Sequence, residues 1–95
     1  MLATILSKLI DASMADPAKP YGHRFTNGLR ITIVFYKQTS QFNLVVARDH
    51  VLPSLVEFKT ILKNWPYPTR ANPAVFDNDG RHYLTAMLPV HEKLI

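Results

Sequence analysis

The 95-residue sequence contains no cysteine and only three glycines, and both shortages limit the chemistry open to it. Without cysteine the chain has no disulfide, no thiolate metal ligand and no cysteine nucleophile. Gly28 and Gly80 follow Asn27 and Asp79 in steps typical of tight turns, so no glycine-rich loop is left to hold the phosphates of a nucleotide. The lack of cysteine also fits a cytoplasmic location.

Long apolar runs are missing as well. No run approaches the roughly 18–20 apolar residues that cross a bilayer, so we expect no transmembrane helix and no membrane partner. Residues 2–10, followed by the small residues Ser13 and Ala15, faintly resemble a signal peptide. Lys8 and Asp11 interrupt this stretch, so we do not expect a targeting role.

Groups suited to catalysis are scattered along the chain. The four histidines lack the His-x-His and His-Glu-x-x-His spacings that hold zinc, and we predict no metal and no cofactor. His82 with Asp77 can form a base and its orienting carboxylate, but no nucleophile motif accompanies them and a cross-strand polar pair explains both residues. Asp49 and His50 are adjacent in sequence, which does not aim both side chains at one point. We therefore predict no catalytic residues and no enzymatic activity.

Composition and charge set only broad limits. Apolar residues make up 47% of the chain, which is ordinary for a folded protein and argues against disorder. The length suits one domain spanning residues 1–95. Eleven Lys and Arg against seven Asp and Glu give a formal charge of +4, a mildly basic balance that favours anionic partners only weakly.

Residues 2–10 carry an apolar stripe at helical spacing. The spacing i, i+3, i+4, i+7, i+8 is shared by Leu2, Ile5, Leu6, Leu9 and Ile10. This predicts a helix that packs on a sheet, and the two prolines in residues 17–20 end it. The alternative is an exposed stripe used for dimerisation or for contact with a membrane surface.

A second amphipathic helix begins after Ser54. The Ser-x-x-Glu spacing of Ser54 and Glu57 is that of a capping box. Helical spacing follows in Leu55, Phe58, Ile61, Leu62 and Trp65. The prolines in residues 65–68 stop the helix, because residues before proline avoid the α region. Trp65 is then a core residue at the helix end, with a protein-binding role for residues 65–68 as the alternative.

Residues 29–36 have two different faces as a strand. Apolar side chains occupy every second position, at Leu29, Ile31, Ile33 and Phe35, which predicts one side buried on a core. The other side carries Arg30, Thr32, Val34 and Tyr36, a mixture that tolerates water or a partner. We expect this strand to be the central strand of the sheet, between two hairpin partners.

The Asn27-Gly28 step predicts a hairpin with a two-residue loop, since both residues tolerate the positive φ of a type I′ turn. That loop places His23 opposite Thr32. It turns three side chains of the first strand, Tyr21, His23 and Phe25, onto the face that carries Arg30 and Tyr36. A one-residue bulge would reverse the assignment of residues 21–26 and make Phe25 a core residue.

Two further hairpins complete the strands. The polar residues 37–41 predict a turn, and pairing that is symmetric about Thr39 and Ser40 places Ile33 opposite Val46. The Asp79-Gly80 step predicts a two-residue turn before residues 81–88. Its pairs are Val75 with Leu84, Phe76 with Tyr83 and Asp77 with His82. The core face then holds Val75, Leu84, Ala86 and Leu88, and the other face holds Phe76, Arg81, Tyr83 and Met87.

The resulting order of elements is α-β-β-β-α-β-β. We predict an α+β fold in which an antiparallel sheet of four to five strands has two helices packed on one face, since each helix has one apolar stripe to bury. No internal linker is long enough to divide two domains.

One face of the predicted sheet is free for function and carries aromatic and basic side chains. Aromatic residues and arginine are enriched at protein interfaces, and a one-sided antiparallel sheet leaves a face to be covered. We therefore predict a small non-catalytic interaction domain that binds a protein partner or forms a homodimer. The residues expected to bind are Tyr21, His23, Arg30, Tyr36, Arg81 and Tyr83.

Nucleic-acid binding by the same face is the alternative. Bases stack on aromatic side chains while Lys and Arg contact phosphate, and Lys59, Lys63 and Arg70 would add positive potential. The RNP sequence pattern and the spacings of helix-turn-helix and zinc-finger motifs are absent. An ordinary solvated sheet surface explains the same residues without any ligand.

Overall fold

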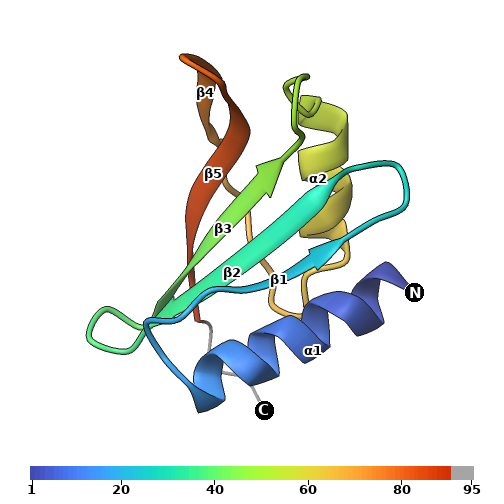
Figure 1. Ribbon diagram of the computed structural model, residues 1–95. Helices are drawn as coiled ribbons and strands as arrows, with labels where there is room; N and C mark the ends of the chain where they lie inside the picture. The colour runs from blue at the N-terminus through green and yellow to red at the C-terminus, as the bar shows by residue number, and fades with distance from the viewer. Residues whose placement is uncertain (91–95) are drawn as a thin grey trace.

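The computed structural model of the protein describes residues 1–90 and shows the α+β fold in the predicted order (Figure 1). Within these residues the elements are α1 (Leu2–Ala15), β1 (Tyr21–Arg24), β2 (Arg30–Tyr36), β3 (Gln41–Ala47), α2 (Leu55–Lys63), β4 (Ala74–Asn78) and β5 (Arg81–Pro89). All neighbouring strands are antiparallel, in the sheet order β1-β2-β3-β5-β4. β2 has a hairpin partner on each side, as predicted, but β3 rather than β2 is the central strand, because β5 and β4 extend the sheet beyond β3.

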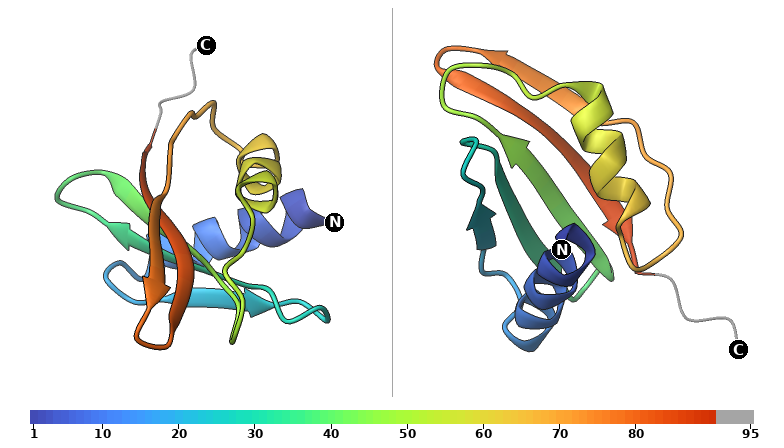
Figure 2. Two further views of the ribbon diagram at one scale, coloured as in Figure 1. Left: turned by 90° about the horizontal axis from the view of Figure 1, so that it is seen from above. Right: turned by 90° about the vertical axis from the view of Figure 1, so that its right-hand side faces the viewer.

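Both helices lie on one face of the twisted sheet, as predicted (Figure 2). α1 buries Leu6 and Ile10, and α2 buries Phe58 and Ile61. The sheet contributes to the same core Leu29, Ile31, Ile33, Phe35, Phe42, Leu44, Val46, Leu84 and Leu88. Their spacing by two is what the alternation of a strand requires, so the core fills the space between the sheet and the helices.

The helix ends follow the local sequence. α1 ends at Ala15, two residues before Pro17. The predicted capping box at α2 is confirmed: the Ser54 hydroxyl accepts from the Glu57 N–H at 3.1 Å, and the Glu57 carboxylate accepts from the Ser54 N–H at 3.0 Å. Leu55 departs from its predicted stripe, because it is 48% exposed in the first turn of α2. Neither helix in residues 1–90 is long and apolar enough to cross a membrane.

The register of β1 against β2 differs by one residue from the register that the predicted two-residue loop would give. His23 lies opposite Ile31 rather than Thr32. A shift by one residue turns every side chain to the other face, so Tyr21 and His23 lie on the helix face. Phe25 packs against the core, which confirms the bulged alternative.

The turn between β1 and β2 is the physical reason for this shift. The Gly28 N–H donates to the Phe25 carbonyl oxygen at 3.0 Å, and the Phe25 N–H donates to the Leu29 carbonyl oxygen at 2.8 Å. Gly28 has a φ of 88°, whereas Asn27 does not have a positive φ. These bonds describe a longer loop in which a turn ends in a glycine bulge, with Asn27 and Gly28 as its last two residues.

The β2–β3 hairpin is shifted by two residues from the prediction. Ile33 lies opposite Leu44, not Val46, and the closing pair is Tyr36 with Gln41. Residues 37–40 therefore form the loop, and Tyr36 lies opposite Gln41 rather than Asn43. Because the shift is even, every side chain keeps its predicted face.

The β4–β5 hairpin has the predicted register. Phe76 lies opposite Tyr83, and both Asp79 (φ 50°) and Gly80 (φ 77°) adopt the left-handed backbone of a two-residue type I′ turn. Leu84 is buried as predicted. Val75 is 57% exposed although it lies on the helix face, because β4 is an edge strand.

Residues 64–73 connect α2 to β4 and are anchored by aromatic side chains. Trp65 is buried with its ring edge against Phe42, the ring centroids being 5.8 Å apart. Tyr67 stacks on Phe42 at 6.4 Å. Trp65 is thus part of the core, as the helical spacing indicated.

Candidate functional site

The sheet face opposite the helices is the candidate site, and we call it the open face. Its main side chains are Arg24 of β1; Arg30, Thr32, Val34 and Tyr36 of β2; Asn43, Val45 and Ala47 of β3; Arg81, Tyr83, Thr85 and Met87 of β5; and Phe76 of β4. None of these residues is buried, and neither helix lies over them (Figure 2). Their side chains are therefore accessible to a ligand in this structure.

One row of side chains crosses all five strands of the open face. Arg24 lies opposite Arg30, which lies opposite Ala47. On the other side of Ala47 come Tyr83 and then Phe76. The rings of Phe76 and Tyr83 stack with centroids 4.8 Å apart and an interplanar angle of 16°. The row thus has a basic end and an aromatic end, separated by a small side chain.

The basic end of this row is partly neutralised by one carboxylate of the chain. The Arg30 guanidinium donates a hydrogen bond to the Asp49 carboxylate, and Arg24 lies 3.9 Å from the same carboxylate. The hydrogen bond and charge of Arg30, with a smaller effect of Arg24, lower the pKa of Asp49. Asp49 therefore stays ionised at neutral pH and holds Arg30 in place.

The rest of the open face combines apolar side chains with polar groups that bond to one another. Tyr36 and Met87 are 40% and 43% exposed, and both line a shallow hollow beside the β2–β3 turn. The Asn43 side-chain amide donates to the Thr85 hydroxyl at 2.9 Å, and Thr85 donates to the Leu44 carbonyl oxygen at 3.0 Å. A partner can cover these groups without leaving them unpaired.

Of the six residues expected to bind, the structure brings four onto the open face: Arg30, Tyr36, Arg81 and Tyr83. Tyr21 and His23 lie on the helix face, contrary to the preferred register, because the bulged turn shifts β1 by one residue. The Tyr21 hydroxyl donates to the Asp16 carboxylate at 2.8 Å, which lowers the pKa of Asp16 and raises that of Tyr21. Tyr21 thus links β1 to the end of α1.

Besides the small Ala47, two residues of the open-face row, Phe76 and Arg24, were not among the expected binding residues. The position of Phe76 could be predicted from the sequence. The β4–β5 register that the sequence implied is the observed one, and it places Phe76 opposite Tyr83. The position of Arg24 could not be predicted from the sequence. The face of the sheet on which Arg24 lies depends on the register of β1, which the Asn-Gly step did not determine.

The structure brings together one pair of the groups considered for catalysis. His82 Nδ1 lies 2.9 Å from the Asp77 carboxylate across β4 and β5, as both a cross-strand polar pair and a base with its orienting carboxylate require. Asp49 bonds to Arg30. Within residues 1–90 no three His, Cys, Asp or Glu side chains lie close enough together to hold a metal ion, and His91 lies outside these residues.

Comparisons of the chain with protein-family models, with curated proteins and with solved structures find no match. No relative therefore supplies a site residue, a ligand or a partner, and the functional interpretation depends on the side chains of the structure itself.

Proposed function

We propose that the protein is a non-catalytic interaction domain that binds another protein chain through its open face. The observation that carries this proposal is the row from Arg24 to Phe76, which crosses five strands on a face that neither helix covers. Exposed aromatic side chains beside arginine and methionine are the composition that protein interfaces favour. The stacked pair of Phe76 and Tyr83 supplies a rigid apolar contact.

The polar groups of the open face also suit a protein partner. Covering a polar group is unfavourable when its hydrogen bonds are lost. Here Arg30 is bonded to Asp49, and Asn43 is bonded to Thr85. A partner that covers the apolar centre of the face therefore leaves these bonds in place.

The proposal includes two kinds of protein partner. One is a second copy of this chain, whose open face would pack against the first, and the other is a different protein. A cytoplasmic location is part of the proposal and rests on the cysteine-free composition.

Nucleic-acid binding is less well supported by the geometry. Single-stranded nucleic acid needs aromatic platforms and free cations on one surface. On the open face Arg30 and Arg24 flank Asp49, which leaves Arg81 as the arginine of this face that makes no ion pair among residues 1–90. Lys59 and Lys63, which also make no ion pair in this part of the chain, belong to α2, on the opposite side of the sheet.

Comparison of the wild-type chain with two single variants tests the proposal. Met87→Asp places a charge on the open face. Val56→Asp is the matched control, because Val56 is an apolar residue that is 73% exposed on α2, outside the open face. Native mass measures self-association, cross-linking in cell extract followed by mass spectrometry identifies a different protein partner, and ultraviolet absorbance detects bound nucleic acid.

We expect the wild type to form a dimer or to cross-link to a specific partner, Met87→Asp to lose that interaction, and Val56→Asp to keep it. Circular dichroism shows whether both variants are folded. A wild-type chain that is monomeric and has no specific cross-link would overturn the proposal, as would an interaction that Met87→Asp leaves unchanged. Nucleic acid that copurifies with the wild type and is lost from Met87→Asp would favour the second candidate.

A further inference from the structure

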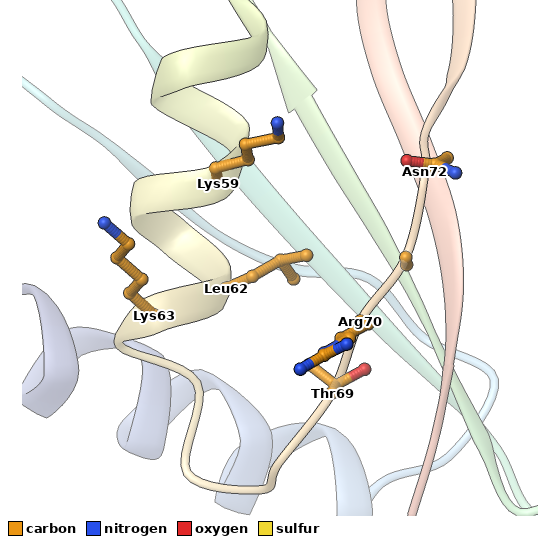
Figure 3. A pocket seen from close by; sticks show the side chains of 7 residues that line it. Lys59, Leu62, Lys63, Thr69, Arg70 and Asn72 are labelled. Carbon is orange, nitrogen blue, oxygen red and sulfur yellow. The ribbon is translucent and has the colours of Figure 1, made fainter.

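A groove of about 580 Å³ lies on the helix side of the molecule, between α2 and the segment that follows it (Figure 3). One wall is formed by Lys59, Leu62 and Lys63 of α2, and the other by Arg70, Ala71 and Asn72. Leu62 points from the helix toward the opposite wall. None of these residues belongs to the open face, so the groove is a second and separate surface.

Among residues 1–90, the groove is lined by three basic side chains and by no acidic one. Lys59, Lys63 and Arg70 have no ion-pair partner within residues 1–90, whereas Arg30 and Arg48 are both paired. Lys59 and Lys63 are also four residues apart on α2, a spacing at which like charges destabilise a helix. Unpaired cations around a concave surface attract an anionic ligand, which would relieve this repulsion.

The wall opposite α2 is held in place without a ligand. Trp65 and Tyr67 fix the start of the connecting segment by packing on Phe42 in the core. The backbone freedom of the segment is limited further by Pro66, Pro68 and Pro73. A preformed groove loses little conformational entropy when it binds, which favours affinity.

We propose that this groove binds an acidic segment of a partner protein. The carboxylates pair with Lys59 and Arg70, and an aliphatic side chain of the same segment rests on Leu62 and Ala71. The Lys63 side chain points away from the opposite wall (Figure 3), so it adds positive potential without direct pairing. The guanidinium of Arg70 can hold a carboxylate through two hydrogen bonds, and the Asn72 amide can both donate to and accept from a peptide backbone. Nucleic acid fits less well, because no aromatic side chain lines the groove to stack on a base.

Selection from a phage-displayed library of random short peptides tests the proposal on the full-length chain. The library is bound to wild-type protein without prior depletion on a variant, and the double variant Lys59→Gln/Arg70→Gln is used only in the later affinity measurements. The matched control is Lys8→Gln/Lys37→Gln, which removes the same charge from exposed residues of α1 and of the β2–β3 turn. Affinities of the selected peptides and of a single-stranded oligothymidine are then measured by fluorescence anisotropy.

We expect the selected peptides to be rich in Asp and Glu with at least one aliphatic residue. They should bind the groove variant at least about tenfold more weakly than the wild type and bind the control variant equally well, with affinity that falls as salt is added. Met87→Asp should leave this binding unchanged, which separates it from the open face. The proposal is overturned if the peptides are neutral or basic, if the groove variant binds them as well as the control does, or if oligothymidine binds more tightly and depends on the same cations.

Discussion

The guanidinium of Arg48, directly after β3, forms two parallel hydrogen bonds with the carboxylate of Glu57 in the first turn of α2, at 2.7 and 2.6 Å. Glu57 also accepts the Ser54 N–H that closes the capping box. One carboxylate therefore joins α2 to the sheet and completes the helix terminus. The hydrogen bonds from Arg48, followed by the contribution of Ser54, lower the pKa of Glu57 from its usual 4.5 to about 2.

This pKa predicts how stability depends on pH. A carboxylate whose pKa is lower in the folded state than in the unfolded state stabilises the fold fully above about pH 4.5 and loses that contribution as the pH falls toward about 2. Each pKa unit corresponds to about 1.4 kcal/mol, but 30% of the Glu57 side chain is exposed, so we expect a contribution of about 1–2 kcal/mol.

Urea unfolding of the wild type and of Glu57→Gln measures this contribution. Glutamine preserves the capping box and removes the charge, so the variant should be less stable at neutral pH by about 1–2 kcal/mol. The two chains should converge in stability toward pH 2. Asp16 and Asp49 also have lowered pKa values, but their effect is common to both chains. A difference in unfolding free energy that does not change with pH would show that the Arg48 pair is not its source.

The face occupied by Phe25 predicts a difference between two aromatic substitutions. Phe25 packs against the core, whereas Tyr36 lies on the open face and is 40% exposed. We expect Phe25→Ala to lower the free energy of unfolding by about 1–3 kcal/mol and Tyr36→Ala to change it by less than about 1 kcal/mol. Denaturant titrations of both variants measure the two effects. Equal effects would argue against the bulged register of β1.

The hairpins show how far the sequence determined the fold. The Asp79-Gly80 step occupies both central positions of a two-residue turn, so the register and both faces of β4 and β5 followed from it. The similar Asn27-Gly28 step forms only the end of a longer loop, because that register lets Phe25 pack on the core. This packing is a tertiary contact, and no local pattern in residues 21–28 reveals it.

The candidate surfaces were predictable to different degrees. Arg30 and Tyr36 were assigned to the open face from the alternation of one strand, which tolerates an even shift in register. Predicting the groove between Lys59 and Arg70 required tertiary contacts that the sequence pattern does not show. Helical spacing placed Lys59 outside the apolar stripe, but the position of Arg70 depends on how Trp65 and Tyr67 fix the connecting segment on Phe42.

The ion pair between Arg30 and Asp49 is predicted to organise the open face without stabilising the fold measurably. Exposed ion pairs gain little because water and salt screen them. A double-mutant cycle with Arg30→Ala and Asp49→Ala should give a coupling energy indistinguishable from zero at physiological salt. Asp49→Ala should also weaken the interaction measured for the open face, because Arg30 then loses its fixed position. A large coupling energy in unfolding would show that the pair is structural instead.

Trp65 gives the last prediction, because its ring is buried while its indole N–H has no hydrogen-bond partner within residues 1–90. Trp65→Ala removes the contact with Phe42 and should destabilise the fold by about 3–5 kcal/mol. Trp65→Phe keeps an aromatic ring at this position and removes the unpaired donor, so its cost should be below about 1.5 kcal/mol. Thermal or urea unfolding separates the two variants. If Trp65→Phe were as destabilising as Trp65→Ala, the indole N–H would have to make a stabilising contact. The conclusion that this N–H has no hydrogen-bond partner would then be wrong.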